Sequence, residues 1–438
     1  MPGHNQDRLS SLPRDVLALI FSYTDKPARL RPLSKTLWPV QQAALYQHAR
    51  FRTVATFAKF VKTVLEHPDH LGKLVEGLVV YNEWKKWDSI AHPVKIEREP
   101  DANCPSTTTL RQLFRALVNL KSLSVTGSSR IAEAALSPVG ADQRFKQLES
   151  LDLHSSVSGW QDPTYVAHFV GIEHWQQLRV FNYITEARVQ PGGGLIPVPP
   201  PEPCPSFPHV KALTVHAPLG GTWKTLDLFK LFSGLTHLAV HASADGSTSF
   251  GVELLKTLPN RSALVALDLV RTDGQHPADI APVLPDLVNL TSLSVGGEGM
   301  IVKKKFYEAI AKLTSLRELS FSIGCKGVAT APLTKVISGA DKHPSLETLV
   351  LDHIRDCAHG GYFPEWTSRF KPKGLEKFLK VADREDVEVV GDALWALDHD
   401  EGGPIDDIID DMQAYKQRYR DFAINTENLL ESMGLPGI

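Results

Sequence analysis

Cysteine is scarce in this 438-residue sequence, which has four of them, at Cys104, Cys204, Cys325 and Cys357. They lie far apart and form no Cys-x-x-Cys pair. The spacing therefore favours neither a disulfide framework nor a zinc module. We interpret all four as buried or chemically idle thiols.

Long apolar runs are also missing. Residues 1–10 are polar and lack the apolar centre of a signal peptide. No segment reaches the roughly 18 apolar residues that a membrane span requires. We therefore expect an intracellular protein, cytoplasmic or nuclear, with no membrane partner.

Neither sign of charge is in clear excess, because 47 basic residues face 50 acidic ones and the formal net charge is −3. A nucleic-acid partner requires a clustered positive field, which this balance does not suggest. The only lysine triplet is Lys303-Lys304-Lys305, and we interpret it as the solvated start of a helix rather than as a phosphate site. We expect no nucleic acid among the partners.

Familiar catalytic motifs are absent as well. The sequence contains no G-x-x-x-x-G-K-[ST], no G-x-S-x-G, no H-E-x-x-H and no strand-linked G-x-G-x-x-G. We expect a protein that is not an enzyme and needs no cofactor. A catalytic group assembled from distant residues is the remaining alternative.

A repeated pattern is what the sequence does contain. Apolar residues stand at positions one, four and six of a short unit, and successive units begin about 25 to 32 residues apart, with one longer step. The units begin at Val75, Leu120, Leu148, Leu178, Val210, Leu235, Leu264, Leu290, Leu316 and Leu346.

Positions four and six of each unit lie two apart, so they share one face of a short strand, while positions five and seven share the other. The segments between units show helical spacing, as in Leu110, Leu113, Phe114 and Leu117; in Phe250, Leu254, Leu255 and Leu258; and in Phe306, Ile310 and Leu313. No unit can bury its apolar face alone, but stacked units can. The sequence thus predicts an α/β fold, a solenoid with an elongated core and one free strand face.

This pattern resembles the leucine-rich repeat family over roughly residues 71 to 380. We assign residues 51–381 to the solenoid, with insertions at 82–109 and 191–208. Trp84 and Trp87 in the first insertion either cover the solenoid end or form an aromatic contact site. The proline-rich second insertion is interpreted as a loop between repeats, although Pro197 to Pro200 has the spacing that SH3 or WW domains read.

The first 50 residues do not follow the repeat. Leu12-Pro13 opens an apolar helical segment with Asp15 near its start and Ile20-Phe21 near its end, and Leu33-Ser34-Lys35 follows. This arrangement resembles an F-box, and Ala44 to Phe51 resembles the linker after the F-box in fungal-type F-box and leucine-rich repeat proteins. The resemblance implies a small all-α segment over residues 1–50 that binds a Skp-family adaptor and through it a cullin.

The same resemblance implies the adaptor-contacting residues. They are Leu12, Pro13, Val16, Leu17, Ile20, Phe21, Leu30, Leu33 and Trp38. The alternative is that these helices only cap the first repeat, a role that every solenoid end must fill.

At the other end, Leu375, Phe378 and Val381 are interpreted as a possible last repeat. Residues 382–438 are interpreted as an acidic stretch followed by a capping helix.

The free strand face is the expected binding surface for a protein substrate. Its charged and histidine positions are Asp152, His154, His216, His241, Asp268, Arg271, Asp352 and His353. Two of the histidines, His216 and His241, fall in consecutive repeats and should stand close together. No matching carboxylate spacing accompanies them, so we expect no metal site.

Two functions remain open from the sequence. The resemblance implies the substrate-recognition subunit of a Skp–cullin–F-box ubiquitin ligase. The alternative is a leucine-rich repeat scaffold or binding module that has no role in ubiquitin transfer.

Overall fold

The computed structural model describes most of the repeat region and neither end of the chain. The described residues are 38–81, 104–137, 139–155, 174–185, 206–218, 231–243, 252–271, 279–297, 300–321, 325, 327–340, 342–352, 354–356, 366–368 and 370–397.

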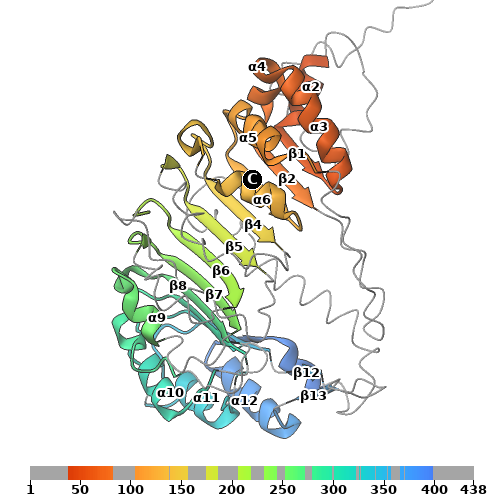
Figure 1. Cartoon of the computed structure of the whole chain (residues 1–438). Helices are drawn as coiled ribbons and strands as arrows, with labels where there is room; N and C mark the ends of the chain where they lie inside the picture. The colour runs from red at the N-terminus through yellow and green to blue at the C-terminus, as the bar shows by residue number, and fades with distance from the viewer. Residues whose placement is uncertain are drawn as a thin grey trace, which may run out of the picture.

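A parallel sheet of 12 strands runs through the molecule, and each strand pairs with the strand of this sheet that follows it in the sequence (Figure 1). The strands are β1 (His48–Phe51), β2 (Gly77–Tyr81), β3 (Ser122–Thr126), β4 (Ser150–Ser155), β5 (Val180–Thr185), β6 (Ala212–Pro218), β7 (His237–Ser243), β8 (Ala266–Arg271), β9 (Ser292–Gly296), β10 (Glu318–Phe321), β11 (Thr348–Leu351) and β14 (Glu388–Val390). A separate antiparallel pair is formed by β12 (Ile354–Asp356) and β13 (Trp366–Ser368).

Helices are found between the strands and border the outer side of the arc that the sheet follows (Figure 1). They are α2 (Trp38–Gln47), α3 (Val54–Glu66), α4 (Pro68–Leu71), α5 (Thr107–Ala116), α6 (Ser129–Leu136), α9 (Val252–Thr257), α10 (Lys304–Ile310), α11 (Thr330–Ile337) and α12 (Pro372–Arg384). Short 3-10 helices are η2 (Gly72–Leu74), η4 (Ala141–Gln143), η7 (Arg261–Ala263), η8 (Leu284–Asp286) and η9 (Asp392–Leu397).

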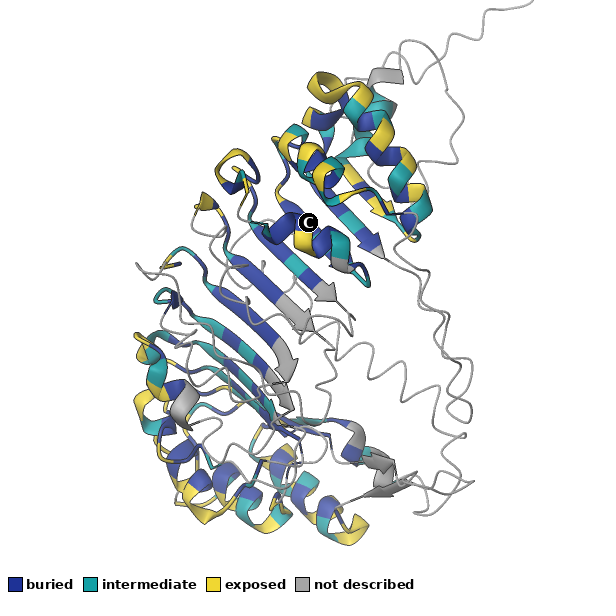
Figure 2. Ribbon diagram, viewed as in Figure 1, coloured by how far each residue is buried: buried dark blue, intermediate teal, exposed yellow. Residues whose placement is uncertain are grey.

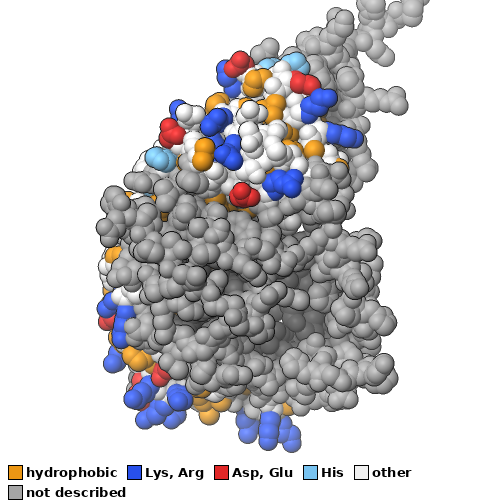
Figure 3. Space-filling view, viewed as in Figure 1, with side chains coloured by type: hydrophobic (Ala, Val, Ile, Leu, Met, Phe, Trp, Pro, Cys, Tyr) orange, Lys and Arg blue, Asp and Glu red, His pale blue; other side chains and the backbone are white. Residues whose placement is uncertain are grey.

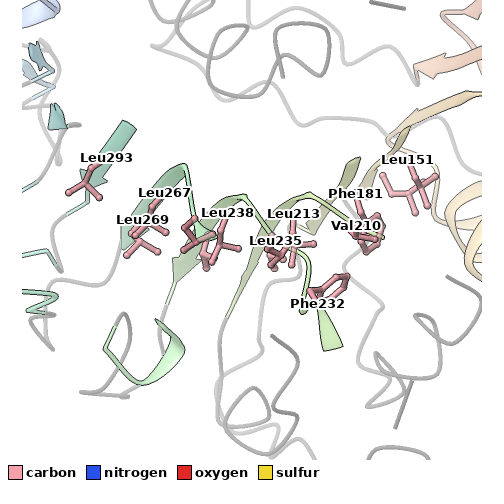
Figure 4. Close-up of a cluster of buried hydrophobic side chains, with 14 of the residues drawn as sticks. Leu151, Phe181, Val210, Leu213, Phe232, Leu235, Leu238, Leu267, Leu269 and Leu293 are labelled. Atoms are coloured by element: carbon pink, nitrogen blue, oxygen red, sulfur yellow. The ribbon is translucent and has the colours of Figure 1, made fainter. Parts of the chain in front are cut away.

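The predicted repeat is confirmed, because each of the ten units supplies one strand, from β2 to β11. Positions one and four of every unit are buried. In Figure 2 the described parts of the strands are mostly buried, whereas the outer helices expose one side. Figure 4 shows side chains of successive units, among them Leu213, Leu238 and Leu267, lying in one continuous row. The fold is an α/β solenoid of the leucine-rich repeat type, whose core extends from one repeat into the next.

Local capping explains where helices α5 and α3 begin. The Ser106 side chain accepts a hydrogen bond from the Thr109 amide at 3.1 Å, and Thr53 accepts one from the Thr56 amide at 3.2 Å. Each bond satisfies an amide that the first helical turn leaves without a partner. Helix α5 therefore starts at Thr107, within the last part of the predicted insertion 82–109; residues 82–103 and 186–205 lie outside the described residues.

Backbone hydrogen bonds join each repeat to the next in the same way. The carbonyl at position two accepts both the position-two and position-three amides of the following unit, at every step from β2 to β11. At Lys121, for example, the amides of Glu149 and Ser150 donate at 2.7 and 3.0 Å. Side chains just before position one add to this seam, since Asn119 donates to the Lys73 carbonyl at 2.7 Å and Asn289 donates to the Ser262 carbonyl at 2.8 Å.

The N-terminal end of the solenoid is tightly packed. Helix α2 runs directly into β1, and Tyr46 stacks on Phe60 of α3 with ring centroids 5.9 Å apart. The ring centroid of Phe51, on β1, also lies 4.8 Å from that of Phe60. The sheet begins at His48, so the last three residues of the predicted helical segment 1–50 belong to a strand.

The predicted last repeat is wrong. Leu375 and Phe378 are buried on one face of helix α12, and Val381 lies on the same helix. The last strand is instead β14, which pairs with β11 and places Val389 beside Leu349. Spacings of three residues fit a helix as well as the first half of a repeat, which explains the error.

The structure also bears on three smaller expectations. Cys104 and Cys325 are buried thiols, while Cys204 and Cys357 lie outside the described residues. Lys303 to Lys305 begin α10 and are exposed, and Lys and Arg side chains gather at this end of the molecule in Figure 3. Among the helices that the structure describes, none is long and apolar enough to cross a membrane.

Candidate functional site

The free strand face is built from three rows of residues that the sheet register aligns. We call the row at position five of the repeats the middle row. From β1 to β14 it contains Arg50, Val79, Ser124, Asp152, Asn182, Thr214, Ala239, Asp268, Ser294, Ser320, Val350 and Val390. Neighbouring strands in a sheet lie about 4.8 Å apart, so consecutive members of the row are close enough to interact.

In the first half of the middle row, a hydrogen bond joins two polar side chains across neighbouring strands. Ser124 on β3 donates a hydrogen bond to Oδ2 of Asp152 on β4, at 2.9 Å. Asn182 on β5 and Thr214 on β6 continue the row and are buried, at 1% and 8% exposure. This part of the face is therefore lined by polar side chains rather than by apolar ones.

In the second half, a carboxylate from position three joins the middle row. Glu318 on β10 lies within electrostatic range of Asp268 on β8. The side chain of Ser292, on the intervening β9, forms a hydrogen bond with the Glu318 carboxylate. Burial raises the pKa of the Glu318 carboxyl, Asp268 raises it further, and the Ser292 hydrogen bond opposes both. The two carboxylates make this the more acidic part of the face, where a cationic group of a partner would be attracted.

The predicted histidines fall in the row at position seven. The register pairs His216 on β6 with His241 on β7, and Ile184 on β5 separates His216 from His154 on β4. Within the described part of the chain, no group of three or more histidine, cysteine, aspartate or glutamate residues is arranged to hold a metal ion.

The remaining predicted site residues are scattered. Asp352 follows β11 directly and is buried, at 5% exposure, and its amide donates to the Phe321 carbonyl at 2.8 Å. Arg271 pairs with Ala242, one register position beyond the histidine row. His353 lies outside the described residues, as do the predicted adaptor-contacting residues before Trp38; Trp38 itself begins α2.

Sequence reasoning missed the residues that surround the two aspartates. Glu318 and Ser292 stand at position three, which we had not assigned to the free face, and Ser124 carries no charge that would draw attention to it. The signal was nevertheless present, because position three has the same parity as positions five and seven in the repeat.

Comparison with known proteins adds little beyond the fold. No family model matches the sequence, and no curated protein matches it. Among solved structures, an internalin from Listeria monocytogenes is similar with 11% identity and a TM-score of 0.34, over 81% of this chain and 94% of that one. A structure of the Rad7 and Elc1 complex in yeast is similar with 12% identity and a TM-score of 0.36, over 77% of this chain and 88% of that one. Likenesses this weak carry no argument about function, so the fold assignment rests on the sheet and its repeat.

Proposed function

We propose that this protein is the substrate-recognition subunit of a Skp–cullin–F-box ubiquitin ligase. In this proposal, the segment from Leu12 to Trp38 binds the Skp-family adaptor, and the free strand face binds a protein substrate. Other subunits of the complex would carry out ubiquitin transfer.

The observation that supports substrate binding is the middle row. Eight of its twelve aligned positions keep some exposure, and the row is long enough to contact an extended stretch of a protein partner. The hydrogen bond between Ser124 and Asp152 fixes these two side chains before a partner binds and so reduces the entropy lost on binding.

The adaptor half of the proposal rests on the resemblance of residues 12 to 38 to an F-box. The way the chain continues from this segment supports it. Helix α2 begins at Trp38 and passes into β1 at His48 with no linker, and the contact between Tyr46 and Phe60 holds α2 against α3. A segment attached to α2 would therefore be carried on a stiff end of the solenoid, as presentation of a substrate to a ligase requires.

Co-purification with a Skp-family adaptor tests the proposal. The full-length protein is expected to form a stoichiometric complex, and Leu17→Asp and Ile20→Asp are expected to abolish it, because each buries a charge in an apolar interface. Ser22→Asp is the matched control, since it adds the same charge in the same segment at a position outside the adaptor-contacting set. Far-UV circular dichroism and the melting temperature must show that each variant is folded.

A folded full-length protein that does not bind the adaptor would contradict the ligase role. The free strand face would then favour the second candidate function, a leucine-rich repeat scaffold or protein-binding module without a ubiquitin role.

A further inference from the structure

Three arginines come together near the N-terminal end of the solenoid, one exposed, one half-buried and one buried. Arg111 and Arg115 lie one turn apart on α5, which packs against α6. Arg144 follows η4, just after α6. We call these three residues the arginine cluster.

Arg144 forms the base of the cluster. Its side chain is buried, at 1% exposure, and Nη1 donates to the Ala134 carbonyl at 2.6 Å. Nη2 donates to the Ser137 carbonyl, so both terminal nitrogens satisfy carbonyls at the C-terminal end of α6. Arg144 is thereby fixed in position and contributes its charge to the surface from beneath.

The segment that carries Arg144 is held firmly. Phe145 lies between Phe114 and Trp175, with ring centroids 5.1 and 5.0 Å away, and Trp175 donates through Nε1 to the Ala141 carbonyl at 3.2 Å. Phe145 also has a positive φ of 55°, a conformation that a bulky residue adopts only when its surroundings impose it. The buried guanidinium is therefore a fixed feature of this surface.

Arg115 and Arg111 form the outer part of the cluster. Arg115 is exposed and places its guanidinium against the backbone of Gly140, where a Cβ would collide with Nη2. Arg111 is half-buried, and its Nε is buried without a hydrogen-bond partner among the described residues. Arg111 and Arg115 lie one turn apart on α5, and each lies within electrostatic range of Arg144.

Little negative charge balances the cluster. Arg144 interacts electrostatically with both Arg111 and Arg115, and Asp142 is the one carboxylate that opposes this repulsion at Arg144 within the described part of the chain. Burial, followed by the two neighbouring arginines, lowers the pKa of Arg144 to about 10. Neither Arg111 nor Arg115 forms an ion pair with a carboxylate of the described residues.

We propose that the arginine cluster binds a phosphate group, with Arg111 and Arg115 donating to its oxygens and Arg144 supplying charge from below. A phosphate monoester carries a charge of about −1.5 to −2 near neutral pH and has three strong acceptor oxygens. Two neighbouring guanidinium groups offer more donors than the two oxygens of a carboxylate can use, and they match phosphate geometry well. The phosphate comes either from free inorganic phosphate or from a phosphorylated side chain of a protein partner.

Thermal unfolding of the full-length protein tests the site. Sodium phosphate is compared with sodium chloride and sodium acetate at equal ionic strength, because screening by salt would otherwise imitate binding. Phosphate is expected to raise the Tm by roughly 2 °C or more at saturation, since a ligand that binds only the folded state stabilises it. Titration of a phosphoserine peptide against the unphosphorylated peptide, followed by calorimetry, then distinguishes the two sources of phosphate.

Arg111→Gln and Arg115→Gln are the informative variants, and Arg317→Gln is the matched control on a distant exposed surface. Each of the first two is expected to weaken phosphate binding by about tenfold or more, through loss of charge-assisted hydrogen bonds. Arg317→Gln should leave binding unchanged, and all three should melt at nearly the wild-type temperature without phosphate. The proposal is overturned if phosphate and acetate act alike, or if Arg115→Gln responds to phosphate as the wild type does. A response to inorganic phosphate but not to the peptide would support the site and identify free phosphate as its ligand.

Discussion

Ser124 and Asp152 are joined across strands β3 and β4 by a hydrogen bond of 2.9 Å in the middle row. The first carries the donor and the second a charged acceptor, and each lies at position five of its repeat. The bond therefore links two repeats through side chains on the surface that we propose for substrate binding.

This pair makes a direct prediction for stability. Ser124→Ala should lower the free energy of unfolding by about 1 to 2 kcal/mol, because a hydrogen bond to a charged acceptor is lost in a partly buried place. Asp152→Asn keeps an acceptor oxygen and should cost less. Urea denaturation of both single variants and the double variant gives the coupling energy; a coupling near zero would show that the contact contributes nothing in solution.

Core packing gives a second prediction. Leu213→Ala removes a side chain from the row of buried leucines in Figure 4 and should cost about 2 to 5 kcal/mol of unfolding free energy. Val288 is 54% exposed at a turn, so Val288→Ala is the control and should change the stability by less than about 0.5 kcal/mol. Equal effects at the two positions would contradict the burial described for Leu213.

The buried His343 predicts a dependence of stability on pH. Its Nε2 lies 2.9 Å from the Leu313 carbonyl, and its Nδ1 accepts from the Ser345 amide, so the neutral ring with a proton on Nε2 fits the site. Burial lowers the pKa of His343, although the backbone carbonyls of Leu313 and Ile310 oppose this. The unfolded chain therefore binds the proton more readily than the folded protein does.

The direction of the pH dependence of stability follows from this difference in proton binding. The stabilising contribution of neutral His343 is complete above the unfolded-state pKa, near 6.5, and is lost as the pH falls through the lower folded-state pKa. Chemical denaturation at pH 7.5 and at pH 5.5 should show lower stability at the acidic pH. His343→Gln offers a donor and an acceptor that do not titrate, and it should reduce this pH dependence; an unchanged dependence would assign it to other groups.

Gly234 yields a prediction about backbone spacing. A Cβ at this position would overlap the Pro208 carbonyl, so Gly234→Ala should destabilise the protein by about 1 to 3 kcal/mol through overpacking. Gly339 serves for comparison, because a Cβ there meets no atom within 4 Å and the only cost is its positive φ of 88°. Thermal unfolding of the two variants should place Gly234→Ala at the lower Tm, and the reverse order would contradict the close approach.

The proposed substrate surface can be tested with two substitutions close together in the sequence, one on the surface and one outside it. Ser294→Arg places a large charged side chain in the middle row, whereas Val288→Arg places the same side chain on the exposed turn before that strand. Once a substrate is identified, Ser294→Arg should weaken its binding at least about tenfold, and Val288→Arg should not. Calorimetry with the purified substrate decides, and equal affinities would place the binding surface elsewhere.

The repeat itself could be predicted from the sequence, because apolar residues at positions one, four and six form a pattern that recurs ten times, and positions one and four are buried in every unit. The two outermost strands, β1 and β14, could not be predicted in this way. In β1 Ala49 and Phe51 occupy the core positions beside Leu78 and Val80, and in β14 only Val389 lies beside a position-four residue, Leu349. An end strand packs against one neighbour instead of two, so fewer of its residues must be apolar.

Prediction of the site was less complete for a different reason. Charged and histidine residues at positions five and seven were easy to single out, but the surroundings of Asp268 depend on Glu318, which is 50 residues away in the numbering of this chain. Only the register of β8, β9 and β10 brings the two into range. A position in the repeat predicts the face of the sheet, whereas the partner on that face depends on which strands are neighbours.

From β1 to β11, each strand of the large sheet pairs with the next one along the chain, and this has a consequence for how such a protein can evolve. Duplication or loss of one whole unit by recombination within a gene would leave all other strands with neighbours in the same register. The surface offered to a partner can therefore lengthen or shorten in steps of one strand spacing, without a new core having to evolve.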